Sequence, residues 1–239
     1  MARRRFIVDT VRNGLAELRG EEARHLTRVL RVEPGQRYEI SDTQRAYLAE
    51  IAEARGERVV FRIIEPIPTP AATVSLTLLA SIVKFDRFEW IVEKATELGV
   101  ERIVPVAAAR TEKGLFDASA KRTERWLRIA REASQQSRRV RIPEIPPAIR
   151  FDRALAEPAD FRCFLDECAE APLLSALPAE RTAGDQVALL LGPEGGWTDP
   201  ERQQAQASGW RAVSLGPQIL RAETAAVAAL AILANAWMV

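Results

Sequence analysis

Apolar and polar residues follow two different rhythms along this 239-residue chain, and the change comes near residue 70. In the first part, short alternating or β-rich stretches are separated by glycine and proline turn signals, which predicts short strands. The strands are expected at residues 4–8, 37–41, 46–52 and 57–64. A helix is expected over residues 22–30, with Leu26, Val29 and Leu30 on one face. Short strands in close succession with one helix predict a small β-barrel.

From residue 73 onward the pattern changes to strands that alternate with helices. The run 74–82 is almost continuously apolar, as expected of a strand buried on both faces. Further strands are expected at 102–106, 161–165, 187–191 and 212–215. Helices are expected at 86–98, 119–137 and 222–237, and after the predicted N-cap Thr198. This alternation predicts an α/β fold, with a parallel sheet flanked by helices.

Three prolines mark the boundary between the two parts. Pro66, Pro68 and Pro70 stiffen the chain within five residues. A chain of this length has room for one small and one larger domain. We therefore expect a β-barrel domain at residues 1–70 and an α/β domain at residues 71–239.

Composition indicates a soluble globular protein, with 47% hydrophobic and 28% charged residues. No apolar run approaches the roughly 20 residues of a membrane-spanning helix. The basic N-terminus has no apolar core after it, so it does not look like a signal peptide. Cys163 and Cys168 are the only cysteines and His25 the only histidine, which argues against a zinc site. We expect a cytoplasmic protein without a metal.

The basic residues are nearly all arginine, although the net charge is only +1. One interpretation is codon usage in a GC-rich genome; another is phosphate recognition, since the guanidinium fork matches phosphate oxygens. Residues 121–141 hold a dense arginine run. It is either a solvated helix face or a phosphate track.

Two glycine-containing loops follow predicted strands near the C-terminal end. Residues 192–196 read GPEGG, which is neither a dinucleotide fingerprint nor a P-loop. The second loop begins at Leu215-Gly216 and leads through LRAETA into a helix. Each is either a plain strand-to-helix turn or half of a pocket in which backbone groups approach a small ligand closely. Backbone groups of the second loop could bond an adenine edge and a ribose. Arg221 and Glu223 are either a surface ion pair or functional groups that position a substrate.

The order of these segments resembles the RsmE-type 16S ribosomal RNA uridine-N3 methyltransferases, within the SPOUT superfamily of knotted methyltransferases. The likeness covers nearly the whole chain. In addition to the two loops, it rests on His25-Leu26, Val29-Leu30-Arg31, Gly35, Lys84, residues 93–100, Gln136, Arg139, Pro143 and residues 220–225 without Ala222. The stretch 166–172 does not match the family pattern, and Arg45-Ala46 and Ser137-Arg138 depart from it. These departures concern the RNA contacts rather than the cofactor loops.

The resemblance implies a PUA-like barrel that helps to hold RNA and an α/β domain whose last elements form a trefoil knot. It implies that S-adenosylmethionine binds between the two loops and that the substrate is 16S ribosomal RNA in the small ribosomal subunit. It also implies a homodimer formed through the knot domain. A small-residue face on the last helix fits close packing of that kind: Ala222, Ala225, Ala226, Ala229 and Leu233.

The resemblance also assigns roles to individual residues. Arg221 and Glu223 are the expected catalytic residues: Arg221 would stabilise charge on the uracil oxygens, and Glu223 would orient the loop or act as a base. The expected cofactor contacts are Leu191, Gly192, Pro193, Glu194, Gly195, Gly196, Leu215, Gly216, Ile219, Leu220, Thr224 and Ala225. The expected RNA contacts are Arg3, Arg4, His25, Arg28, Arg31, Lys84 and Arg139. Two alternatives stay open, a non-catalytic RNA-binding assembly factor and a SPOUT methyltransferase that acts on another RNA.

Overall fold

The structure is a computed structural model that describes residues 5–69 and 73–238. The described residues divide into two compact units. The first unit takes residues from Met1–Ala71 and the segment Arg131–Ile142. The second takes residues from Ala72–Ala130 and Pro143–Val239. None of the helices in the described ranges is long and apolar enough to cross a membrane.

The first unit is built on a six-stranded sheet with the order β1-β4-β5-β6-β3-β2. Its strands are β1 (Arg5–Ile7), β2 (Val11–Arg12), β3 (Leu15–Arg19), β4 (Arg37–Ser41), β5 (Ala46–Arg55) and β6 (Arg58–Ile67). β1 runs parallel to β4, and the other neighbours are antiparallel. Register shifts between β5 and β6 bend the sheet. Phe6, Ile40, Ile51 and Phe61 form its core.

The helix of this unit is shorter than the apolar pattern predicted. α1 (Gly20–Arg28) buries Ala23 and Leu26, but Val29 and Leu30 are 64% and 46% exposed. The prediction of one shared apolar face was therefore wrong. The chain turns at Arg31, which has a left-handed backbone with φ 50°, and Val32 returns to the core. This turn leaves two apolar side chains in solvent.

A segment distant in sequence completes the first unit. The guanidinium of Arg131 donates to Glu22 Oε1 at 2.7 Å and to the Ile7 carbonyl oxygen at 2.6 Å. The hydrogen bond with Glu22 raises the pKa of Arg131. Ser41 Oγ donates to the Val140 carbonyl oxygen at 2.7 Å. The pattern of strands and helices did not predict that residues 131–142 belong with the barrel.

The second unit holds a six-stranded sheet in which all strands are parallel, with the order β12-β10-β11-β7-β8-β9. The strands are β7 (Val74–Ser81), β8 (Arg102–Ala107), β9 (Ile149–Arg150), β10 (Phe161–Leu165), β11 (Asp185–Leu191) and β12 (Arg211–Val213). β11 and β7 are central and mainly apolar, because helices cover both of their faces. β12 ends at Val213, so Leu215, which was predicted to end this strand, lies beyond it.

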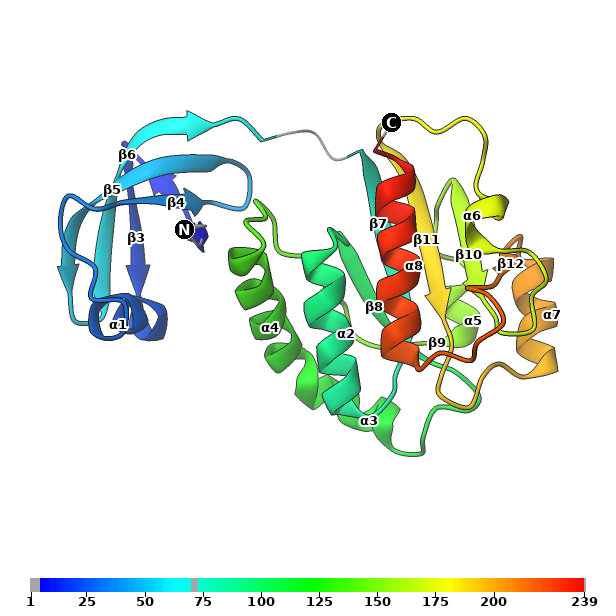
Figure 1. Cartoon of the computed structure of the whole chain (residues 1–239). Coiled ribbons are helices and arrows are strands. Elements are labelled where there is room, and N and C mark those ends of the chain that lie inside the picture. Colours follow the sequence, from blue (N-terminus) through cyan, green and yellow to red (C-terminus); the bar gives the residue numbers. More distant parts are fainter. Residues whose placement is uncertain (1–4, 70–72, 239) are drawn as a thin grey trace. The chain divides into compact units, whose positions relative to one another are not determined.

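Helices cover both faces of this sheet. α2 (Phe85–Glu97) and α8 (Ala222–Ala236) pack side by side on one face (Figure 1). α5 (Phe151–Ala154) and α7 (Asp199–Ala207) pack on the other, in a core with Leu79, Val104 and Leu190. The predicted helix 119–137 is three elements: α3 (Leu115–Ser119), a 3-10 turn at Ala120–Arg122 and α4 (Thr123–Gln136). A short helix that the pattern did not predict, α6 (Leu173–Ala176), precedes β11.

The small-residue face of α8 is already buried within this chain. Ala226, Ala229 and Leu233 are at most 1% exposed, and Ala222 and Ala225 are buried too. α2 packs against this helix. The expectation that this face serves a second copy of the chain was therefore wrong, since close helix packing occurs inside one protomer.

Candidate functional site

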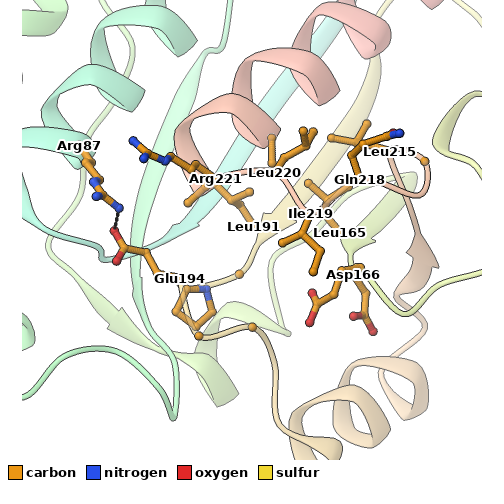
Figure 2. A pocket seen from close by; sticks show the side chains of 18 residues that line it. Arg87, Leu165, Asp166, Leu191, Glu194, Leu215, Gln218, Ile219, Leu220 and Arg221 are labelled. Atoms are coloured by element: carbon orange, nitrogen blue, oxygen red, sulfur yellow. Dashed lines mark hydrogen bonds and ion pairs between the residues drawn. The ribbon is translucent and has the colours of Figure 1, made fainter.

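The pocket that concerns us lies where three parallel strands end, in the second unit. β10, β11 and β12 are neighbours, so their carboxyl ends meet at one edge of the sheet, the usual place for ligands in parallel α/β sheets. The pocket has a volume of about 500 Å³. It is lined by Arg87, Leu165, Asp166, Glu167, Leu191, Gly192, Pro193, Glu194, Gly195, Gly196, Leu215, Gly216, Gln218, Ile219, Leu220, Arg221, Ala222 and Ala225 (Figure 2).

Trp197 anchors the first loop, residues 192–197. Its ring is fully buried and stacks on Phe164 with 4.7 Å between ring centroids. Its Nε1 donates to the Leu165 carbonyl oxygen at 2.8 Å. A Cβ at Gly192 would lie 3.0 Å from the indole, so glycine lets the loop pass close over the ring. These contacts hold the loop at the end of β11.

A helix cap holds the far end of the same loop. Thr198 is the N-cap of α7, as the sequence predicted, and the structure adds a capping box between Thr198 and Glu201. Glu201 is buried, and its Oε1 also accepts from the Ala109 backbone nitrogen at 2.7 Å. One buried carboxylate thus joins the loop after β8 to the start of α7.

An acidic wall stands on one side of the pocket, where β10 ends. Asp166 is buried and accepts from the Arg202 guanidinium at 2.8 Å and 3.1 Å. These hydrogen bonds raise the pKa of Arg202. Glu167 is 3.3 Å from Arg202 and faces Gly196, whose backbone is left-handed with φ 69°. Asp166, Glu167 and Cys168 place their ligand-type atoms within 4.8 Å of one another. The Arg202 cation contacts all three, which disfavours a metal ion there.

The second loop forms the opposite wall. Gly216 has φ 107°, a conformation that favours glycine, and turns the chain just after β12. Arg221 is the extended N-cap residue of α8. Between them, Ile219 is 89% exposed and lines the same pocket as Leu191 and Leu165 (Figure 2). An exposed isoleucine at a pocket is available to pack on a ligand.

A cationic group closes the other end of the pocket. Arg87, in the first turn of α2, pairs with Glu194 of the first loop. The Arg221 side chain extends toward this pair (Figure 2). The pocket therefore has a polar end with two arginines and Glu194, an apolar middle, and an acidic side at Asp166.

The structure brings together in this pocket almost all the site residues that were predicted in the two loops. Leu191, the GPEGG residues, Leu215, Gly216, Ile219, Leu220, Arg221 and Ala225 line the pocket. Glu223 and Thr224 lie in the first turn of α8, outside this lining. Thr224 is exposed. Glu223 Oε2 is buried, with no hydrogen-bond partner among the described atoms.

Sequence reasoning missed six lining residues, which are Arg87, Leu165, Asp166, Glu167, Gln218 and Ala222. A signal existed for one group. Asp166 directly follows the strand 161–165, and parallel strands place their carboxyl ends at one edge. Arg87 had no such signal, because only the packing of α2 brings it to the pocket.

The predicted RNA contacts fall in both units. His25, Arg28 and Arg31 are exposed at the end of α1, in the first unit. Lys84 is exposed at the N-cap of α2, in the second. Arg139 is half-buried, and its backbone nitrogen donates to Ser134. Arg3 and Arg4 lie outside the described residues.

The arginine run at 121–141 is largely committed to pairing within each unit. Arg125 donates to Glu89 at 2.6 Å, and Arg122 lies 3.8 Å from the same carboxylate. Arg131 pairs with Glu22, as described above. These three arginines are already paired with carboxylates, which argues against a continuous row of phosphate-binding arginines along α4.

Comparison with known proteins agrees with this architecture. The model of an RNA methyltransferase domain matches residues 70–234, and that of an RNA methyltransferase PUA domain matches residues 18–64. The chain is 30% identical to the ribosomal RNA small subunit methyltransferase E of Bacillus subtilis, over 95% of this chain and 94% of the relative. The chain belongs to the ribosomal RNA small subunit methyltransferase E family.

Similar solved structures have the same fold over nearly the whole chain. The Neisseria gonorrhoeae ribosomal RNA small subunit methyltransferase E, bound to S-adenosylmethionine, superposes with a TM-score of 0.87, at 31% identity and 98% coverage of both chains. A putative methyltransferase from Legionella pneumophila, also in complex with S-adenosylmethionine, gives 0.88 at 28% identity, over 99% of this chain and 98% of the other. The predicted family, the α/β class and the PUA-type N-terminal domain are confirmed.

Proposed function

We propose that this protein transfers a methyl group from S-adenosylmethionine to N3 of one uridine in 16S ribosomal RNA of the small subunit. The observation that carries the proposal is the pocket between the loops 192–197 and 215–221, in a chain of the methyltransferase E family. Two relatives of the same fold were crystallised with S-adenosylmethionine. Family membership supports RNA methylation, and the choice of uridine N3 rests on the resemblance of the motifs.

The pocket suits S-adenosylmethionine in size and polarity. Its volume falls within the roughly 300–1,000 Å³ of small-ligand sites. Leu191, Leu215 and Leu220 offer apolar walls for an adenine ring. Backbone groups of both loops stand beside them and can recognise its edge. The acidic wall at Glu167 suits ribose hydroxyl or ammonium donors, and Arg87 at the other end suits a carboxylate.

When bound, S-adenosylmethionine supplies an electrophilic methyl group, so that the N3–carbon bond forms as the carbon–sulfur bond breaks and the N3 proton leaves. The protein's contribution is mainly to hold donor and acceptor in line. As N3 loses its proton, negative charge spreads to the uracil oxygens. Arg221 extends from the wall of the pocket and stabilises this charge.

Glu223 has a supporting role in this proposal. Its Oε2 is buried without a partner among the described atoms, which is a costly state for a carboxylate oxygen. Glu223 stands two residues after Arg221, in the first turn of α8. We assign it to orienting the second loop through a donor that arrives with the substrate, or to accepting the N3 proton.

The end of α1 is the proposed RNA contact of the first unit. Arg28 and Arg31 are exposed and form no hydrogen bond or ion pair with a described side chain. They flank the exposed Val29 and Leu30. Unpaired guanidinium groups suit phosphates, and apolar side chains suit the faces of unstacked bases. His25 lies one turn earlier on α1 and joins this surface.

Several features stay predictions that rest on the resemblance. They are the trefoil knot, the homodimer and recognition of an assembled subunit rather than free RNA, whereas the predicted domain limits 1–70 and 71–239 rest on the three prolines and the change of pattern near residue 70. RNA contacts through Lys84, Arg139, Arg3 and Arg4 belong to the same group.

One experiment tests the function directly. Small subunits that lack the modification are incubated with the protein and S-adenosylmethionine, and their RNA is digested and analysed by mass spectrometry. We expect 3-methyluridine at one position. Cofactor binding in calorimetry without product on small subunits would direct the search to another RNA. Absence of both binding and product would favour a non-catalytic assembly factor.

A further inference from the structure

Arg110 stands outside the pocket, yet its side chain lies against the loop that forms the pocket wall. Its Nη1 donates to the Gly195 carbonyl oxygen at 2.6 Å and to the Trp197 carbonyl oxygen at 3.3 Å. It pairs with no acidic side chain in residues 5–69 and 73–238. The charge of Arg110 is thus directed at two carbonyl groups of one loop.

Gly195 leaves room for the Arg110 side chain, because glycine has no Cβ. A Cβ at Gly195 would lie 3.3 Å from Cδ and 3.5 Å from Cβ of Arg110. Gly195 does not have a positive φ, so its backbone conformation is open to other residues. Glycine is required at this position because the Arg110 side chain approaches so closely.

The segment that carries Arg110 is itself anchored. Ala108 and Thr111 exchange hydrogen bonds at 2.9 Å and 3.1 Å, which closes a tight turn around Arg110. Next to it, the Ala109 nitrogen donates to the buried Glu201, which caps α7. The turn after β8 therefore holds the second half of the loop, through Gly195 and Trp197, and the start of α7, through Glu201.

We propose that Arg110 is a positioning residue for the cofactor, which acts by holding the loop 192–197 in its binding shape. This inference rests on the proposed function. Arg110 draws the carbonyl groups of Gly195 and Trp197 to itself, so the loop needs no ordering when the ligand enters. A loop that is ordered before binding holds the cofactor more tightly, because binding then causes no further loss of conformational entropy in the loop. Arg110 does not touch the reacting atoms.

Calorimetry with S-adenosylmethionine tests the proposal on the wild type, Arg110→Ala and Arg110→Lys. We expect Arg110→Ala to weaken the affinity about tenfold, which is about 1.4 kcal/mol. Arg110→Lys keeps the charge and one donor, so it should lose only about threefold. The turnover number at saturating cofactor should stay within about twofold of the wild type. Lys113→Ala is the matched control, because Lys113 is exposed and lies four residues after Ala109, which binds Glu201.

A double-mutant cycle with Gly195→Ala tests the contact itself. In the wild-type background, the new Cβ presses on Arg110 and should weaken cofactor binding. In the Arg110→Ala background that obstacle is gone, so Gly195→Ala should cost little more. Full additivity of the two losses would show that Arg110 and Gly195 act independently and would overturn the proposal.

Two other outcomes would also overturn it. Unchanged cofactor affinity in Arg110→Ala would remove the positioning role. A change confined to the KM for RNA would make Arg110 an RNA contact instead. If the wild type itself failed to bind S-adenosylmethionine, the proposed function would fall first, and this result is recognisable because it appears before any substitution is made.

Discussion

The indole nitrogen of Trp197 donates to the carbonyl oxygen of Leu165 at 2.8 Å, and this bond joins the loop after β11 to the end of β10. Both groups are buried, so neither finds water if the bond is lost. Trp197→Phe leaves the Leu165 carbonyl without its partner and should cost about 2 kcal/mol of unfolding free energy. Denaturant unfolding measures this, and cofactor affinity should fall as well. Trp90→Phe, at an exposed tryptophan, is the control; equal losses would contradict the role of the Trp197 bond.

Gly196 offers a test of the acidic wall. Gly196→Ala places a Cβ in a left-handed backbone and 2.6 Å from Glu167 Oε1. Since the carboxylate can rotate away, the loss of stability should be about 1 kcal/mol, set by the backbone. Gly209→Ala has a similar φ of 81° with open space around it, so it should lose the same stability. Only Gly196→Ala should weaken cofactor binding, by displacing Glu167; equal affinities for the two variants would remove Glu167 from the site.

Arg221 should act on the chemical step rather than on cofactor binding. Removing one group that stabilises a developing negative charge typically slows turnover about 100-fold or more. We therefore expect Arg221→Ala to lower kcat by about 100-fold while the calorimetric Kd for S-adenosylmethionine changes less than threefold. A loss of the same size in both quantities would make Arg221 a residue of the cofactor loop.

The end of α1 should affect RNA and leave the cofactor alone. Arg28→Ala and Arg31→Ala should each weaken binding of small subunits. Each should also make the slope of log K against log salt concentration shallower by about one. Val29→Ser should weaken binding without changing the salt dependence, since it removes only an apolar contact. Arg55→Ala, an exposed arginine of β5 in the same unit, is the control. Unaltered binding in all three variants would move the RNA contact elsewhere.

The two cysteines should differ sharply in reactivity. Burial raises the pKa of the Cys163 thiol to about 11, whereas Cys168 is exposed. Iodoacetamide at pH 8 should modify one thiol of the native protein and both after denaturation, which mass spectrometry counts. Because the folded state holds the Cys163 proton more tightly, stability from this group is present below the ordinary thiol pKa and declines as the pH rises from about 9 toward 11. Rapid labelling of Cys163 in the native protein would contradict its burial.

Short-range sequence signals determined the elements and the two loops of this protein. The apolar run of β7, the cap of Thr198 and the glycine at 216 each act within a few residues, so pattern and backbone chemistry suffice to predict them. Parallel pairing then places neighbouring strand ends together, which is why most of the pocket was predicted from residues 191–196 and 215–225.

Only the tertiary structure decided the contacts between segments distant in sequence. It turned Val29 and Leu30 outward, because the chain reverses at Arg31 before the helix can bury them. It packed the small residues of α8 within the protomer. It also brought Arg87 to Glu194 and Arg110 to Gly195, pairs separated by 107 and 85 residues. A side chain's own sequence neighbourhood carries no information about such partners, since the packing of strands and helices sets which surfaces meet.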